Sequence, residues 1–220
     1  MTLALIVLLP LLGSLLPLLT VRYGRSLCAL ATMLAPVIGL FLLWELAPVV
    51  FDGGVVVQSW PWLSQIGLNL SFRLDGLGFL FALLIQGIGI LVILYARYYL
   101  SKRDPMGRFF AFLLLFMAAM LGVVLSENML LMMFFWELTS LSSFLLIGYW
   151  SHSTDARKGA RMALAVTGGG GLALLAGVLL LGQMVGSYEL TDVLAAGDLI
   201  RSHALYPVVL VLILLGAFTK

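Results

Sequence analysis

A single acidic residue, Glu137, lies in the middle of a long apolar stretch, residues 128–150, which reads NMLLMMFFWELTSLSSFLLIGYW. Counted from Met129, it falls about 12 Å along a helix, close to the midplane of a hydrocarbon core about 30 Å thick. A central Asp, Lys or Arg costs about 2.5–3.5 kcal/mol there, so we expect the penalty on Glu137 to be relieved by protonation, by a cation or by water. Each of these changes is a step by which a membrane protein moves ions.

Hydroxyl side chains accompany this acid. Ser140 falls at i+3 on the same helical face, and Thr139, Ser142 and Ser143 form an adjacent polar stripe. Such hydroxyls can hold water beside a titrating group, and they are equally typical of close helix packing. Glu137 could likewise be a structural acid bonded to a neighbouring helix, so both interpretations stay open.

Composition places the chain among integral membrane proteins. It is 63% hydrophobic and only 10% charged, with a mean hydropathy of +1.16. A soluble enzyme is not expected, and the dispersed net charge of +2 does not indicate nucleic acid. The one cysteine, Cys28, excludes an internal disulfide, an iron–sulfur cluster and a cysteine zinc site, so we expect no cofactor and no metal.

Seven apolar runs predict an all-α polytopic fold. They cover about residues 3–19, 27–50, 75–99, 108–125 and 128–150, a stretch after Arg161 to about Met184, and residues 204–220. The first run is not a signal peptide, because its basic residues follow it. Asn128 is a reasonable N-cap for the Glu137 helix. Gln86 is predicted to form a helix-packing hydrogen bond within the third run.

Two connections have patterns of their own. Residues 52–74 include Leu68 to Leu74, where apolar and polar residues alternate as in a half-buried strand, and a small outer β-hairpin is predicted. Residues 187–203 carry apolar residues at helical spacing and predict a short helix along the membrane surface. Four glycines, Gly168 to Gly171, lack the setting of a phosphate loop, so they predict close helix packing or a local weak point.

Basic residues predict the orientation. Nine lie in or beside the odd-numbered connections: Arg22, Arg25, Arg97, Lys102, Arg103, Arg108, Arg157, Lys158 and Arg161. The even-numbered connections hold only Arg73 and Arg201. Cytoplasmic loops are enriched in Lys and Arg, so the N-terminus is predicted to lie outside, with the hairpin and residues 187–203 facing outward.

The seventh run ends in Phe218-Thr219-Lys220, which leaves a lysine at a depth where no water is expected. We therefore expect the chain to be a fragment cut in or just after its seventh helix.

The segments SENMLLMMFFWELTSLSSFLLIGYW and LLGAFTK resemble the antiporter-like membrane subunits shared by Mrp-type sodium/proton antiporters and respiratory complex I. The FWELTSLSSFLLIGYW run is most similar to the large A subunits of the Mrp family. The resemblance implies that Glu137 of the WE motif and Lys220 of the TK motif are paired intramembrane charges of a proton channel. It also implies fourteen or more helices with inverted repeats, so residues 1–107 would form an N-terminal three-helix segment and residues 108–220 the start of the first repeat.

The physics of such a pair agrees with that role. Opposite charges about 7 Å apart in an effective dielectric near 20 attract by roughly 2 kcal/mol, so their separation changes the proton affinity of both by about one to two pK units. The resemblance implies a subunit of a multisubunit Na⁺/proton antiporter in the plasma membrane, with other antiporter subunits, the lipid bilayer, protons and Na⁺ or another monovalent cation as partners. The alternatives are a proton-pumping subunit of complex I or a related membrane-bound hydrogenase, and a non-conducting membrane scaffold.

Overall fold

The computed structural model describes residues 1–220, and its chain divides by contact into two compact units. Unit 1 comprises residues 1–58 and 73–125, and unit 2 comprises residues 59–72 and 126–220. Ten α-helices and a two-stranded sheet make up the fold. Six helical segments are long and apolar enough to cross a membrane, so the protein is a multi-pass helical membrane protein.

Unit 1 contains the first five helices. They are α1 (Thr2–Gly13), α2 (Leu16–Thr20), α3 (Arg25–Phe51), α4 (Gly76–Tyr99) and α5 (Met106–Leu125). The first apolar run thus forms two helices, although residues 2–23 together remain one candidate span. The break follows Ser14, whose hydroxyl donates to the Leu11 carbonyl at 2.7 Å, and Pro17 lies in the first turn of α2.

The middle of α3 packs closely on α4 through Gly39. A Cβ at Gly39 would overlap the amide oxygen of Gln86, which is fully buried. Gln86 therefore packs between helices as predicted, but the predicted hydrogen bond is wrong, because neither amide atom has a partner. Packing against the bare backbone of Gly39 places the amide where no donor or acceptor faces it.

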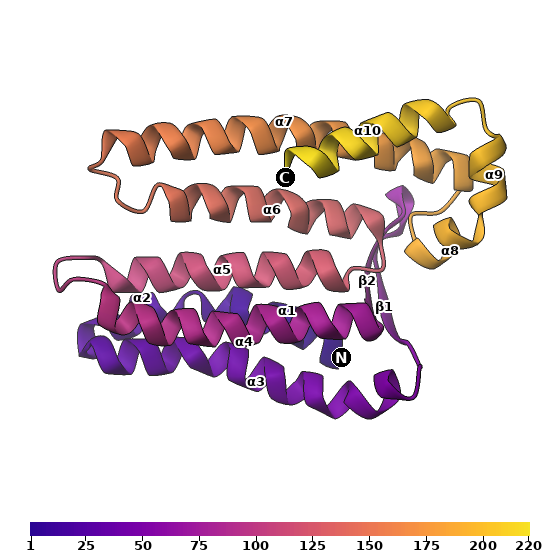
Figure 1. Ribbon diagram of the computed structural model, residues 1–220. Coiled ribbons are helices and arrows are strands. Elements are labelled where there is room, and N and C mark those ends of the chain that lie inside the picture. Colours follow the sequence, from indigo (N-terminus) through magenta and orange to yellow (C-terminus); the bar gives the residue numbers. More distant parts are fainter. The chain divides into compact units, whose positions relative to one another are not determined.

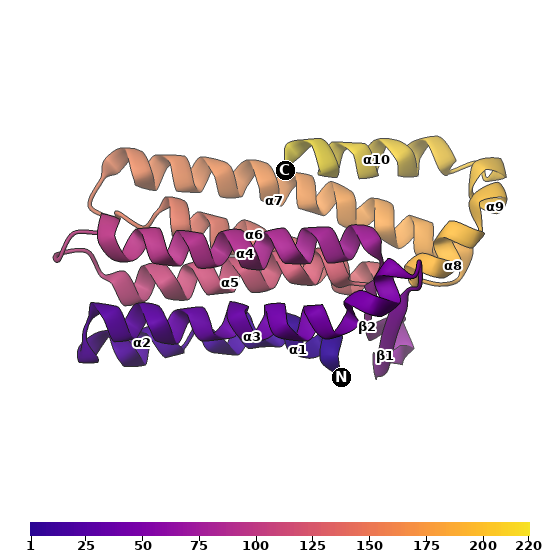
Figure 2. The same cartoon turned by 60° about the horizontal axis from the view of Figure 1, so that its bottom comes forward.

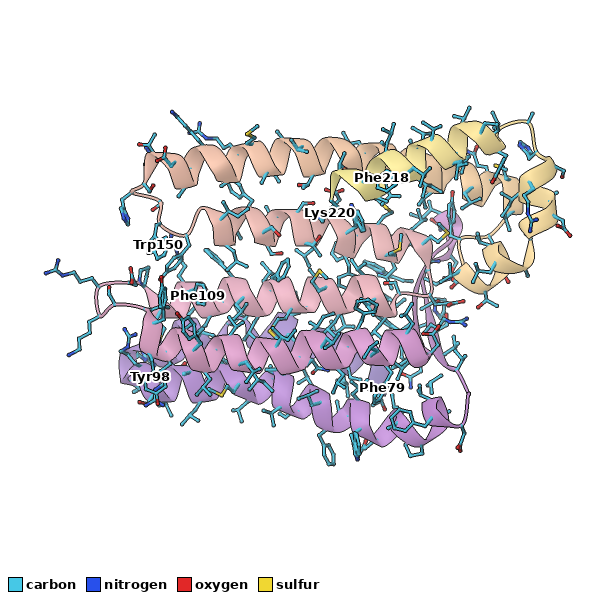
Figure 3. The ribbon with its side chains drawn as sticks, viewed as in Figure 1. Phe79, Tyr98, Phe109, Trp150, Phe218 and Lys220 are labelled. Atoms are coloured by element: carbon cyan, nitrogen blue, oxygen red, sulfur yellow. The ribbon has the colours of Figure 1, made fainter.

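Polar groups cap both ends of α4. Asp75 accepts a hydrogen bond from the Gly78 amide at 2.9 Å, and this bond lowers the pKa of the Asp75 carboxyl, with a smaller contribution from Arg73. At the other end, the Arg25 guanidinium donates to the carbonyls of Arg97, Leu100 and Ser101 at 3.0, 2.5 and 2.9 Å. Figure 3 labels Phe79 near the first of these ends and Tyr98 near the second.

The predicted hairpin is confirmed. Strands β1 (Val56–Leu63) and β2 (Leu68–Leu74) pair in a two-stranded sheet. A 3₁₀ turn, Ser64–Ile66, connects them and ends at Gly67, whose φ of 74° is in the left-handed region that favours glycine.

Unit 2 holds the remaining helices, which are α6 (Met129–Ile147), α7 (Thr154–Val185), α8 (Leu190–Ala195), α9 (Gly197–Ser202) and α10 (Tyr206–Thr219). Residues 187–203 form two short helices rather than the predicted one, with the break at Ala196. The helix α10 has 14 residues, about 21 Å, which is shorter than a full span. It lies alongside α7, with the C-terminus beside the middle of that helix (Figures 1 and 2).

Candidate functional site

Asn128 is the N-cap of α6, as predicted. Asn128 is fully buried, and its side-chain oxygen accepts from the amides of Leu130 and Leu131 at 3.1 and 3.2 Å. Its amide nitrogen donates to the Gly67 carbonyl at 2.9 Å and to Glu189 Oε1 at 3.0 Å. These bonds therefore fix the residue at which α6, the helix that carries Glu137, begins.

Glu189 and Glu127 extend these hydrogen bonds into a polar network. Glu189 Oε1 also accepts from Asn69 at 2.9 Å and from Ser71 at 3.3 Å. Glu127, which is 4% exposed, accepts from the amide and the hydroxyl of Thr191. The network joins β2, the turn before α6 and the segment before α8, and so holds unit 2 together at the hairpin end. Nothing in the local sequence indicates it, because its partners lie about 60 to 120 residues apart.

Glu137 lies eight residues into α6 and faces an apolar groove. The groove, of about 610 Å³, is lined by α6 and α7, and Glu137 is its only ionisable residue: the lining residues are Leu130, Met133, Phe134, Glu137, Leu138, Leu141, Leu164, Gly171, Leu172 and Leu175. The Glu137 side chain is exposed in unit 2 and forms no hydrogen bond or salt bridge. The Glu137 carboxylate therefore has no bonded group that would compensate its charge in this apolar setting.

The glycine run of α7 lies against this carboxylate. A Cβ at Gly171 would overlap Glu137 Oε1, and a Cβ at Gly170 would overlap the side chain of Thr219 in α10. The interpretation of these glycines as close packing is therefore confirmed for Gly170 and Gly171. At Gly168 and Gly169 a Cβ would meet no atom within 4 Å.

Lys220 reaches α6 from the end of α10. Its Nζ donates to Ser140 Oγ at 2.6 Å and to the Trp136 carbonyl at 3.2 Å, and it lies 5.2 Å from the centroid of the Trp136 ring. Figure 3 labels Lys220 between α10 and α6. The lysine thus contacts the residue before Glu137 and the residue three after it, while no salt bridge within 4.0 Å joins Lys220 to Glu137.

The other predicted polar residues divide between two roles. Ser140 is 2% exposed and contacts Lys220, not Glu137. Thr139 and Ser142 are buried, and their hydroxyls donate at 2.7 Å to the carbonyls of Trp136 and Leu138 in their own helix. Ser143 is half-buried. The hydroxyls of Thr139 and Ser142 are therefore satisfied within α6, and their part in a proton path stays a prediction.

Three residues of this site, Trp136, Gly170 and Gly171, were not predicted as site residues. Trp136 adjoins the acid in the WE motif, and its carbonyl accepts from both Thr139 and Lys220. The glycines were visible as a run, but the sequence does not show which of the four face α6 and α10.

Two family descriptions match the chain. Residues 60–110 match "NADH-Ubiquinone oxidoreductase (complex I), chain 5 N-terminus", and residues 126–220 match "NADH:quinone oxidoreductase/Mrp antiporter, TM". The fold is that of a polytopic helical membrane protein, which agrees with the membrane subunits that these descriptions name. The chain belongs to the antiporter-like family that Mrp antiporters share with NADH:quinone oxidoreductase, as the resemblance predicted.

Within that family, the chain is similar to A-type antiporter subunits. It is 58% identical over 175 residues to the probable K(+)/H(+) antiporter A/B subunit of Rhizobium meliloti, covering 80% of this chain and 18% of that protein. It is 48% identical over 169 residues to the A-type subunit of the Na(+)/H(+) antiporter of Alkalihalophilus pseudofirmus, covering 76% and 21%. The chain thus spans about a fifth of the length of these relatives.

A solved structure of the Mrp complex from Dietzia sp. DQ12-45-1b contains a chain of the same fold. The TM-score is 0.82 at 29% sequence identity, and the match covers all of this chain and 24% of that one.

Proposed function

We propose that this chain is part of a subunit of a multisubunit monovalent cation/proton antiporter, in which Glu137 and Lys220 carry protons through the membrane. The observation that carries the proposal is the setting of the two charges. Lys220 is held on α6 by Ser140 and Trp136, within one helical turn of Glu137, while the Glu137 carboxylate has no bonded partner. Each charge can therefore gain or lose its proton without first breaking a direct ion pair.

The two charges are close enough to influence one another. At an assumed separation of about 7 Å and an effective dielectric near 20, two opposite charges attract by roughly 2 kcal/mol, which is enough to couple their proton affinities. A movement of α10 along α7 would change that separation and so load or release a proton. The similar A-type subunits from two bacteria support this function, and their names give different cations, K⁺ and Na⁺. The transported ion is thus Na⁺ or another monovalent cation.

The test is exchange in everted membrane vesicles from cells that carry the complete protein. Glu137→Gln keeps the side-chain shape and removes the titratable charge, so cation/proton exchange should fall at least about tenfold at normal complex abundance. Glu137→Asp should be milder. The matched control is Glu45→Gln, which makes the same change near the end of α3 and should leave exchange within about twofold of wild type. Wild-type exchange by Glu137→Gln would return this acid to the structural interpretation.

A double-mutant cycle tests the pair. Lys220→Ala should also impair exchange, and the combination with Glu137→Gln should cause less loss than the two single effects added, since each single change leaves one charge without the other. Strictly additive losses would show that the two residues act independently.

The second candidate is a proton-pumping subunit driven by a redox partner, as in complex I or a related hydrogenase. It is favoured by the match of residues 60–110 to the complex I family description. Vesicles given a cation gradient but no electron donor separate the two functions, because an antiporter exchanges ions under those conditions and a redox-driven pump does not. A non-conducting scaffold would lose assembly, but not exchange alone, when Glu137 is neutralised.

We further propose that the protein works with other antiporter subunits in the plasma membrane, with its N-terminus outside. The nine-to-two distribution of basic residues supports this orientation. Single cysteines at the exposed Ser64 and Ser101, in a background with Cys28 replaced, should differ in labelling by an impermeant thiol reagent. Ser64 should be labelled from outside, and equal or reversed labelling would reject the orientation. The division into residues 1–107 and the first repeat from 108 also stays a prediction.

A further inference from the structure

The four glycines in the middle of α7 are not equivalent. Gly168 and Gly169 have no neighbour within 4 Å of an added Cβ, and Gly169 is exposed. Gly170 and Gly171 are buried, and an added Cβ at either would overlap another side chain. Glycine lowers helix stability relative to alanine. At positions 170 and 171 the missing side chain allows a close contact in return, whereas at positions 168 and 169 it allows none.

At Gly171 the missing side chain makes room for a carboxylate. An added Cβ would overlap Oε1 of Glu137 and would lie 3.4 Å from Oε2. The carboxylate therefore lies directly on the backbone of α7, where that helix lines the apolar groove. Any other residue at position 171 would push it outward, toward the open groove.

At Gly170 the missing side chain makes room for the end of α10. Thr219, the residue before Lys220, occupies the space, and its hydroxyl donates to the Gly216 carbonyl at 2.9 Å. Gly216 in turn faces α7, since an added Cβ there would lie 2.9 Å from the Gly170 carbonyl oxygen and 3.0 Å from Leu174 Cα. The backbone of α7 therefore determines how closely the last turn of α10 approaches.

We propose that Gly171 is a positioning residue for proton translocation, seating the Glu137 carboxylate on the backbone of α7 next to the point where Gly170 receives Thr219. Two adjacent residues of one rigid helix then set the positions of both intramembrane charges, and with them the separation on which their coupling depends. This inference rests on the proposed function, and it adds the element that fixes the geometry of the pair.

The test compares Gly171→Ala with Gly169→Ala, a matched control in the same glycine run. In vesicles carrying the assembled complex, Gly171→Ala should lower cation/proton exchange at least about tenfold, while Gly169→Ala should stay within about twofold of wild type. A combined Glu137→Asp and Gly171→Ala variant should regain at least about threefold over Gly171→Ala alone, because the shorter acid withdraws from the new methyl group. A merely structural glycine would not be rescued by shortening this one acid.

A second measurement, the rate of chemical labelling of Glu137, reports the accessibility of its carboxylate without relying on transport. Dicyclohexylcarbodiimide reacts with carboxyl groups in apolar surroundings, the carboxyl O–H adding across one C=N bond, and mass spectrometry measures the adduct on Glu137. Gly171→Ala should raise the labelling rate at least about threefold, since the carboxylate is displaced into the groove. Rates within about twofold of those of Gly169→Ala would overturn the proposal.

The outcomes separate this inference from the proposed function. If Glu137→Gln keeps exchange, the proposed function fails, and the labelling comparison still decides whether Gly171 seats the carboxylate. If Glu137→Gln abolishes exchange while Gly171→Ala behaves like Gly169→Ala, the function stands and the inference fails. If Gly171→Ala does not assemble, assembly of the variant that combines it with Glu137→Asp supports the proposal that Gly171 positions the Glu137 carboxylate. Failure of the combined variant to assemble overturns that proposal.

Discussion

Replacing Asn128 by alanine should destabilise unit 2 more than any ordinary helix-cap change. The side chain makes four hydrogen bonds while fully buried, two as the N-cap of α6 and two as donor to Gly67 and Glu189. Loss of the cap removes about 1 kcal/mol. Loss of the bond to the carboxylate removes about 1.5–3 kcal/mol, and the Gly67 carbonyl left without its donor adds about 1 kcal/mol. The expected total for Asn128→Ala is about 4 kcal/mol.

Two further variants separate the contributions to the expected loss of stability. Asn128→Ser keeps the cap and loses both donors, so its effect should be smaller by about 1 kcal/mol. Asn69→Ala removes a single donor to Glu189 Oε1 and should lower stability by only about 1–2 kcal/mol. The measurement is the thermal unfolding midpoint of the purified complex in detergent, followed by tryptophan fluorescence. An Asn128→Ala midpoint equal to that of Asn69→Ala would refute the reasoning, because it would mean that the cap and the Gly67 bond contribute nothing.

Three further predictions concern unit 1. Gln86→Met should be neutral or stabilising, because it removes two buried amide atoms without partners, whereas Gly39→Ala should lower thermal stability by overlapping that amide; the opposite order would show that Gln86 has a bonding role. Asp75→Ala should lower stability by about 1 kcal/mol at neutral pH through loss of the cap. Because the pKa of Asp75 is lowered in the folded state, its charge stabilises the fold above the ordinary value of 3.8, and the difference from wild type should shrink as the pH falls below that value; a difference constant down to about pH 3 would contradict this. Arg25→Ala should lower the unfolding midpoint more than Arg25→Lys, since the guanidinium reaches three carbonyls of the α4 end and an ammonium cannot span them all; equal midpoints would count against the cap.

The long helices were predictable because their signals are local. Hydrophobic runs of about 20 residues predict spans, and single polar residues such as Asn128 mark where they begin. Alternation over Leu68 to Leu74 was enough for a strand. The local pattern did not show how many breaks interrupt the helices. Residues 187–203 carry apolar residues at helical spacing on both sides of Ala196, so the pattern continues through a point where the helix is interrupted.

The contacts of polar residues were less predictable than the helices. The motif positions predicted Glu137 and Lys220 as site residues, but which face of α6 the lysine reaches depends on how α10 is rotated against α7. That rotation is set by the contacts of Gly170 with Thr219 and of Gly216 with Leu174, pairs that are about 40 to 50 residues apart in sequence. The network of the buried Glu127 and the half-buried Glu189 was missed for the same reason, since a single sequence does not show which distant partners satisfy a carboxylate.

Under the proposed function, the separate attachments of Glu137 and Lys220 bear directly on transport. A salt bridge at about 4 Å in an effective dielectric near 20 would hold the charges with about 4 kcal/mol, whereas at an assumed separation of about 7 Å the attraction would be about 2 kcal/mol. Lys220 is instead held by neutral groups, the Ser140 hydroxyl and the Trp136 carbonyl, while Glu137 lies on the α7 backbone. Under the proposed function this is the favourable arrangement, because a proton can leave or arrive at either group against the smaller charge–charge attraction. A small shift of α10 is then sufficient to change which of the two groups holds the proton.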